Sequence, residues 1–521
     1  MYVLATLLLL FLAVVTMAAL RLSRSSVSFA WLTAVLGALV AWISILFWQI
    51  DLPHLYSPSL WQPTSLFNAS PELLADSYAW IYALSLTALA GAVVLTSPVR
   101  TSALNPVAWA GTLALTILGL LAVLADNPLT LVLAWAAIDL VEFAIMVRTA
   151  HSASLSERTV ISFSIRAIGT GIALWASVVS AINGQTFLFE NASAKVGIIL
   201  LLAVGLRLGV LPLHLSYKND STLRRGFGTT LRLTAAASSL ILLARLPFSA
   251  LDPAIVPIAL AFVALAAFYS AWRWFSAPNE LIGRPYWIIG MSALSLAATL
   301  RGNSAGSAAW GVAMLLFGGI SFLYSARQIW YTRILAGLGI LLMAAPLSLT
   351  ASGWMGAFPQ PLIFWPLFLT AHVMLLGGYI RHLFRAGETS YFELPVWAKT
   401  AYPLGLGILV VTALVVSLWG WPGALQVGVW SVPVFLLVLS ILVGFALFRF
   451  RRFFLPALSS PSAARLSRLS DLQDVIARAL WTSYRILGRL FTYVANLLEG
   501  DGGLLWTLLL LVLFITILRG R

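Results

Sequence analysis

"VGLRLGVLPLHLSYKND", residues 204–220, begins inside an apolar run and places an arginine within it. Arg207 keeps its charge at any ordinary pH, so it has to be paired wherever it is buried. Gly209 and Pro212 follow at once and predict a broken helix, because proline removes a backbone donor and disrupts the preceding turn. A permanent charge beside a helix break is unusual in a soluble core and is typical of a membrane protein that handles ions.

The composition of the whole chain supports this interpretation. Of its 521 residues, 61% are hydrophobic and 9% are charged, and the mean hydropathy is +0.97, far above that of soluble globular proteins. The absence of cysteine excludes disulfides, thiolate metal sites and cysteine nucleophiles. The five histidines are scattered. We therefore expect no catalytic residue, no cofactor and no metal site in this chain.

Apolar windows of about 20 residues predict about sixteen membrane spans with uncertain ends. The first carries no basic region before it and no small-residue cleavage site, so we expect a retained helix rather than a signal peptide. The predicted fold class is an all-α polytopic membrane helix bundle of about 14–16 transmembrane helices with broken helices. The spans are 3–20, 28–50, 77–97, 105–125, 128–147, 159–181, 197–213, 228–246, 255–275, 285–300, 307–325, 333–350, 361–381, 402–419, 429–449 and 502–519.

The distribution of basic residues predicts the topology. With the N-terminus outside, 23 of the 31 basic residues fall on one side, which the positive-inside rule makes cytoplasmic. The others lie outside (Lys195, Arg245, Arg301, Arg519, Arg521) or within spans (Arg166, Arg207, Arg232). The net charge of +14 therefore indicates attraction to anionic lipid headgroups, not a nucleic-acid partner.

Three regions follow from this pattern: N-terminal helices over 1–100, a core over 101–450, and a C-terminal region over 451–521. In the last, Ser470 and Gln473 form a capping box that predicts a helix, and the apolar residues after it share one face. We expect an amphipathic lateral helix followed by a final span. It acts either as a generic interfacial anchor or as a strut that binds partner subunits.

Four charges lie deep within predicted spans: Asp139, Glu142, Arg207 and Arg232. Asp139 and Glu142 are three residues apart and share a helix face. We expect Asp139 to pair with an intramembrane arginine and slightly favour Glu142 as a rim acid paired with Arg148. His214 is either a titratable group at the cytoplasmic edge of the break or an interfacial histidine solvated together with Lys218.

The stretches "GLRLGVLPLHLSYKND" and "GTTLRLTAAASSLILLARLPF" resemble the antiporter-like membrane subunits of respiratory complex I, Mrp-type cation/proton antiporters and energy-converting hydrogenases. The ending "LEGDGGLLW" is similar to the close of hydrogenase-type members. The residues at family motif positions are Trp135, His151, Arg207, Pro212, Leu213, His214 and Arg232. The resemblance implies proton or ion translocation through Asp139, Glu142, Arg207, His214 and Arg232, with the helix broken at Gly209 and Pro212.

The departures from the family matter equally. Both family lysines are arginines here, and the family's glutamate position is Ala136, for which Asp139 is a possible substitute. The central relay positions are Gly318 and Gly319, the exit position is Ala357, and His372 in the next span is expected to be structural.

The resemblance leaves several functions open. The first is a membrane-arm subunit of an ion-translocating redox complex, of NADH–quinone oxidoreductase or hydrogenase type, whose quinone and iron–sulfur sites belong to partner subunits. The alternatives are a non-conducting scaffold subunit of such a complex and the ion-coupled membrane partner of an uptake system. In each case we expect other membrane subunits and the lipid bilayer as partners, in the plasma membrane of a prokaryote.

Overall fold

The computed structural model of the chain describes most of the first 449 residues. The described ranges are 2–23, 27–57, 70–99, 105–149, 152–182, 188–211, 223–346, 348–354, 364–419 and 431–449, together with residues 482, 485, 486, 489, 493 and 511. The chain divides into two compact units, 1–459 and 460–521. The further division of the first unit at residue 100 stays a prediction.

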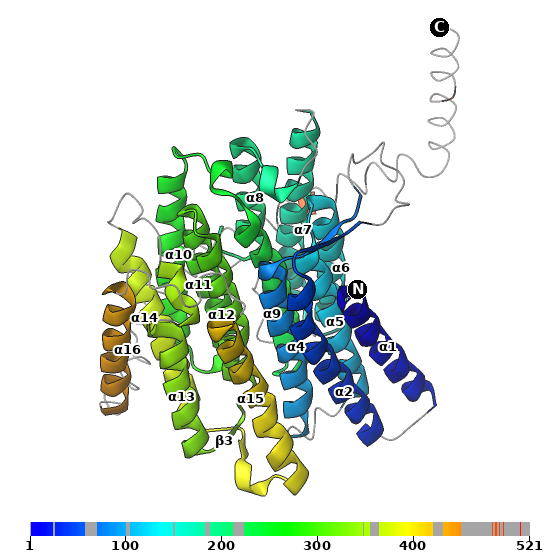
Figure 1. The fold of residues 1–521 in the computed structure, drawn as a ribbon, viewed down its shortest axis with the longest axis vertical. Helices are drawn as coiled ribbons and strands as arrows, with labels where there is room; N and C mark the ends of the chain where they lie inside the picture. The colour runs from blue at the N-terminus through cyan, green and yellow to red at the C-terminus, as the bar shows by residue number, and fades with distance from the viewer. Residues whose placement is uncertain are drawn as a thin grey trace, which may run out of the picture. The chain divides into compact units, whose positions relative to one another are not determined.

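The first unit is a bundle of long α-helices (Figure 1). Each of the first fifteen predicted apolar runs contains one α-helix. Side-chain caps start several of these helices: Asp76 accepts from the backbone of Ala79 at 2.6 Å, and Asn303 accepts from that of Gly306 at 2.7 Å. The helices described are α1 (Tyr2–Leu22), α2 (Val27–Leu46), α4 (Ser77–Thr96), α5 (Pro106–Leu124), α6 (Pro128–Thr149), α7 (Ala153–Ile182), α8 (Ala194–Arg207), α9 (Phe227–Arg245), α10 (Val256–Ser276), α11 (Glu280–Leu300), α12 (Ser304–Leu323), α13 (Ile329–Ala344), α14 (Trp365–Leu383), α15 (Val396–Leu418) and α16 (Ser431–Arg449).

Two short β-pairs connect helix ends. Strands β1 (His54–Tyr56) and β2 (Leu73–Ala75) are antiparallel, with Leu55 opposite Leu74. Strands β3 (Ala326–Arg327) and β4 (Thr389–Ser390) are parallel.

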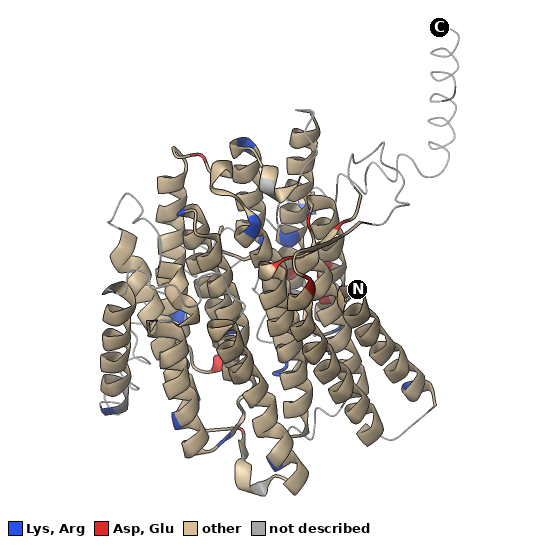
Figure 2. Ribbon diagram, in the orientation of Figure 1, with Lys and Arg blue, Asp and Glu red and all other residues tan. Residues whose placement is uncertain are grey.

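The polytopic all-α membrane fold is confirmed. The fifteen α-helices coincide with the first fifteen predicted spans, and the sixteenth, 502–519, lies outside the described residues except for Leu511. Eleven of the helices in the described ranges are long and apolar enough to cross a membrane. Charged residues are sparse along them (Figure 2).

Burial separates central helices from peripheral ones. Nearly every residue of α4, α9 and α12 is buried, whereas α1, α2, α7 and α10 expose large apolar side chains. A helix that is apolar and buried all round belongs to the centre of a bundle. Helices α4, α9 and α12 therefore form the centre of the bundle.

Helix α8 ends close to the predicted break. It ends at Arg207, and Gly209 adopts φ = 67°, a conformation that favours glycine. The backbone nitrogens of Val210 and Leu211 both donate to the carbonyl of Gly205 at 3.0 Å, which closes the turn. Pro212 lies outside the described residues.

A second break was not predicted. The span expected at 333–350 is interrupted, because α13 ends at Ala344 and the chain continues after Pro346 as a short 3₁₀ helix, η8 (Leu349–Trp354). Proline restrains the preceding residue to extended conformations and so favours such an ending. In the second unit, Thr482, Arg485, Ile486, Arg489 and Tyr493 are helical, where the lateral helix was predicted.

Candidate functional site: a buried charge cluster at the α8 break

Asp139 of α6 and Arg207 at the end of α8 form a buried ion pair with two contacts. Nη1 and Nη2 of Arg207 donate to Oδ2 and Oδ1 of Asp139 at 2.5 and 3.0 Å. Asp139 is 4% exposed and Arg207 is 3% exposed. Paired contacts fix the orientation of the guanidinium as well as its position. The expected arginine partner of Asp139 is thus Arg207.

Neighbouring helices complete the surroundings of Arg207. Its Nη1 also donates to Thr170 Oγ1 at 2.7 Å and to the carbonyl of Arg166 at 3.3 Å, both on α7, and its Nε donates to Ser239 Oγ of α9 at 3.3 Å. The guanidinium carbon lies 4.2 Å from the centroid of the Trp135 ring. Five groups therefore hold this side chain in one place.

Glycine at position 169 permits this close packing of α7 on α8. A Cβ added to Gly169 would lie 2.8 Å from Cγ of Arg207 and 2.9 Å from the carbonyl oxygen of Ala203. Both distances are shorter than real Cβ contacts, so the arginine depends on a glycine opposite it.

Glu142 was expected as a rim acid paired with Arg148, and the structure shows this to be wrong. Glu142 is 5% exposed, its Oε2 accepts from Arg166, and its Oε1 accepts from Arg232. Nη1 of Arg166 also lies 3.7 Å from Oδ1 of Asp139, so this arginine bridges the two acids. The physical reason is that α6 turns both acids inward between α7 and α9, away from the helix end.

We call Asp139, Glu142, Arg166, Arg207 and Arg232 the charge cluster. Three arginines and two acids leave one net positive charge when both acids are ionised. Since arginine does not release its proton, a proton or cation that passes here has to use the carboxylates or water beside them. A void of about 10 Å³ lies against Asp139, Glu142 and Arg166, at the lower limit for one water molecule.

Sequence reasoning missed part of this cluster. Arg166 was recognised only as a shallower charge, although its position eight residues into a predicted span was the available signal. Thr170 and Ser239 carried no signal, because single hydroxyl residues are common in apolar helices and their partners lie on other helices. His214, Pro212, Leu213 and His151 lie outside the described residues.

A cavity of about 460 Å³ opens at the end of the bundle predicted to be cytoplasmic. Its polar lining includes Asn105, Thr112, Thr149 and Arg224. An apolar cluster separates it from the charge cluster. The cluster consists of Leu115, Met146, Leu223 and Leu231, with Val141, Ile145 and Phe227 packed against it. Ile145, Leu223 and Phe227 face the cavity, while Met146 lines the void beside Glu142.

A second ion network lies at the same end and was not predicted. Glu280 at the start of α11 accepts from Arg225 and from Arg327 of β3, both at 2.9 Å, and Arg225 also contacts Glu388. This network connects the segment that follows the α8 break to the α12–α13 and α14–α15 connections. Its position at helix ends fits a structural role, in which it holds these connecting segments together.

The centre of the bundle is closely packed where the family's relay was expected. A Cβ on Gly318 would lie 2.7 Å from Nε1 of Trp287, and one on Gly319 would lie 3.0 Å from side-chain carbons of Leu89 and Leu409. The Trp287 indole instead donates to the carbonyl of Met314 at 3.1 Å. His372 is buried with its ring against Trp310 and Trp354, and its structural role stays a prediction. Ala357 lies outside the described residues.

Within the described part of the chain, no group of three or more histidine, aspartate or glutamate side chains could hold a metal ion.

Comparisons with known proteins identify the fold. No protein-family model and no curated protein matches the chain. Among solved structures, a chain of the Mrp complex from Dietzia sp. DQ12-45-1b has a TM-score of 0.72 and 16% identity over 100% of this chain, which spans 63% of that chain. A chain of the membrane-bound sulfane sulfur reductase, an archaeal respiratory membrane complex, has a TM-score of 0.64 and 15% identity over 98% of this chain and 99% of that one. The likeness to these membrane complexes is one of fold.

Proposed function

We propose that this chain is a membrane subunit of a multisubunit complex that moves protons or other cations across the membrane, and that the charge cluster takes part in that movement. The observation that carries the proposal is the buried pair of Asp139 and Arg207 at the α8 break. Charges at membrane depth are costly and mark ion pathways more often than structure. The two proteins of similar fold both come from multisubunit membrane complexes.

In this proposal ions reach the charge cluster from the cytoplasmic cavity. The apolar cluster at Ile145, Leu223 and Phe227 has no polar group to hold water, so it blocks the route until water enters. Asp139 and Glu142 then exchange a proton or cation with that water. The arginines hold both carboxylates in position and repel a second cation.

The wider assignment rests on the same proposal. The chain belongs to the plasma membrane of a prokaryote with its N-terminus outside, because most basic residues then face the cytoplasm. The driving reaction is a redox reaction or an uptake process in partner subunits. Quinone and iron–sulfur sites would lie in those subunits, since this chain has no cysteine ligands.

A specific observation favours a second candidate, a non-conducting scaffold subunit. Trp287, Leu89 and Leu409 fill the space at Gly318 and Gly319 where an ionisable relay would stand. A scaffold needs the charge cluster only to hold α6, α7, α8 and α9 together.

The substitution Asp139→Asn separates the two candidates, because it keeps the shape of the side chain and removes its charge. Inside-out membrane vesicles from cells that carry the variant in place of the wild-type chain report ion movement with a pH-sensitive dye, after addition of the cation or the respiratory substrate. The amount of assembled complex is measured in the same membranes, and Asp252→Asn in the α9–α10 connection serves as the matched control.

A conducting subunit predicts loss of ion movement per assembled complex. A fall in complex abundance with unchanged movement per complex supports the scaffold. If both quantities match those of Asp252→Asn, the charge cluster has no part in the function and the proposal fails.

A further inference from the structure

Buried hydroxyl groups lie along α4, α11 and α12. Tyr82 of α4 is 0% exposed, and its hydroxyl has no hydrogen-bond partner among the described residues. A buried hydroxyl without a partner destabilises the fold, because it has lost its hydrogen bonds to water. Such an atom in a well-packed region usually marks a bound water or a function.

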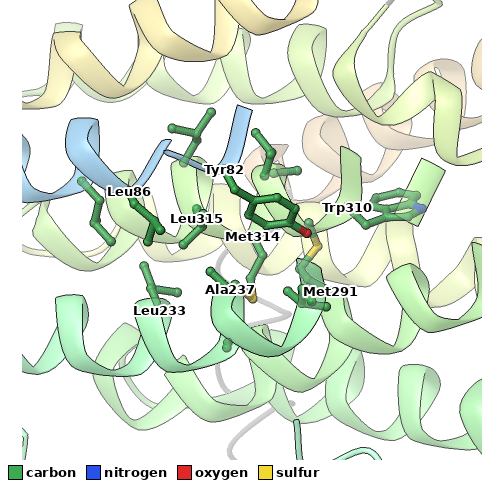
Figure 3. Packing of buried hydrophobic residues seen from close by; sticks show 14 of the residues in the cluster. Tyr82, Leu86, Leu233, Ala237, Met291, Trp310, Met314 and Leu315 are labelled. Carbon is green, nitrogen blue, oxygen red and sulfur yellow. The ribbon is translucent and has the colours of Figure 1, made fainter. Parts of the chain in front are cut away.

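The sequence makes room for this hydroxyl. A Cβ on Gly311 of α12 would lie only 1.8 Å from the Tyr82 oxygen. In Figure 3 the Tyr82 ring lies among apolar side chains and its hydroxyl points toward Met291 of α11. The oxygen of Tyr82 is therefore inserted between α11 and α12 at the level of Met291 and Gly311.

A group of three hydroxyls begins one helical turn away from Met291 and Gly311. They belong to Ser295 and Thr299 of α11 and to Ser307 of α12. Ser307 is four residues before Gly311 on α12, and Ser295 is four residues after Met291 on α11. Their Oγ atoms are 2.8 Å apart, and Thr299 donates to Ser307 Oγ at 2.9 Å. One helical turn rises about 5.4 Å, which is longer than a hydrogen bond, so the Tyr82 oxygen needs a water between the two levels to connect with this group.

This group leads to the end of the bundle predicted to be external. Ser307 is one turn from Asn303, which caps α12, and Arg301 lies at the same end of α11. Nδ2 of Asn303 donates to the carbonyl of Ser352 at 2.7 Å, and Arg301 donates to that of Gly353, so η8 covers the end of this run.

We infer that Tyr82, one bound water, Ser307, Ser295 and Thr299 form a path of hydroxyls that carries protons between the centre of the bundle and the external end of α12. Each hydroxyl accepts a proton on its oxygen and releases its own proton to the next oxygen, and it then rotates back to its starting orientation, so every group stays neutral and no co-reactant is needed. The inference rests on the proposed function and adds to it an outward path that contains no side chain charged at neutral pH.

The substitution Tyr82→Phe tests the path, because it removes one oxygen and keeps the ring. The expected result in the vesicle assay is a loss of proton movement of roughly tenfold or more per assembled complex. The thermal midpoint of the purified complex should stay unchanged or rise, since the variant removes a hydroxyl that has no protein partner. A merely structural role predicts the opposite for the midpoint.

Two further variants keep the test decisive. Ser307→Ala should give the same loss of proton movement, and it decides the question if Tyr82→Phe does not accumulate. Tyr379→Phe is the matched control: this tyrosine is equally buried, but its hydroxyl donates to the carbonyl of Leu335 at 3.2 Å on α13, outside the path. It should lower stability slightly and leave proton movement as in the wild type.

The outcomes separate this inference from the proposed function. Wild-type proton movement in both Tyr82→Phe and Ser307→Ala, with loss in Asp139→Asn, overturns the hydroxyl path and leaves the proposed function standing. Equal losses of stability and proton movement in Tyr82→Phe also overturn the path, because they indicate packing alone. Wild-type behaviour of all three variants overturns both.

Discussion

The two broken helices of the bundle satisfy their breaks in different ways. Helix α8 ends at Arg207, whose guanidinium is held by Asp139 and Thr170. Helix α13 ends before Pro346, and at this break the hydroxyl of Thr350 donates to the carbonyl of Met343 at 2.6 Å. At α8 the freed carbonyl of Gly205 accepts from the backbone nitrogens of Val210 and Leu211, so neither break needs a charge to satisfy its backbone. The charge at α8 exceeds what the backbone requires, which is why we assign ion handling to that break.

Removal of the charge at α8 should have the largest effect. Arg207→Leu leaves Asp139 buried with only the more distant Arg166 nearby, and loss of one partner of a buried pair costs about 3–5 kcal/mol. We expect a large fall in the amount of assembled complex and in its thermal midpoint. Arg207→Lys is the control, because it keeps a charge and should retain assembly with an altered pH dependence of ion movement. Normal assembly of Arg207→Leu would show that the two breaks do not differ in kind.

Loss of the Thr170 hydroxyl, which accepts from Arg207 at the α8 break, should have the second-largest effect. Thr170→Val removes the oxygen that accepts from Arg207 at 2.7 Å, and a hydrogen bond to a charged group contributes about 1.5–3 kcal/mol. The thermal midpoint should fall clearly. Ion movement per complex should fall as well, because the guanidinium loses one of the groups that orient it. An effect no larger than that of the exposed Thr16→Val variant would contradict this picture of Arg207.

Comparison of the two breaks also shows which features of the fold could be predicted from the sequence alone. The apolar runs predicted fifteen of the observed helices, because a span of about 20 residues is set by membrane thickness. The α8 break was predicted because Gly209 and Pro212 follow a charge that had already drawn attention to this span. The α13 break was missed although Pro346 was visible, since nothing polar near it drew attention to that proline.

The site was predictable only in part for the same reason. Asp139, Glu142, Arg207 and Arg232 were found because each is a charge within an apolar run. Their pairing was not fully deducible, because it depends on the packing of α6, α7 and α9. Thus the rim position assigned to Glu142 was wrong, and the hydroxyls around Tyr82 gave no signal at all.

The backbone of the α8 break gives a smaller prediction. Gly209 has φ = 67°, and a residue with a Cβ pays about 1–2 kcal/mol to adopt this conformation. Gly209→Ala should therefore lower the thermal midpoint modestly and slow ion movement only as far as Arg207 shifts. Gly407→Ala in α15, where a Cβ meets nothing within 4 Å, is the control and should not destabilise the complex. Equal midpoints for the two variants would mean that the turn at Gly209 is not needed.

The smallest effect is expected for the loss of the Thr350 hydroxyl at the α13 break. Thr350→Val removes the hydroxyl that donates to the Met343 carbonyl while it keeps the volume of the side chain. A neutral hydrogen bond of this kind contributes about 1 kcal/mol, less than the charged bond lost in Thr170→Val. The thermal midpoint should therefore fall less than in Thr170→Val, and ion movement per complex should not change, because no charge depends on Thr350. If Thr350→Val reduced ion movement as much as Thr170→Val, the function would not be specific to the α8 break, and the α13 break would have to be treated as a second part of the ion path.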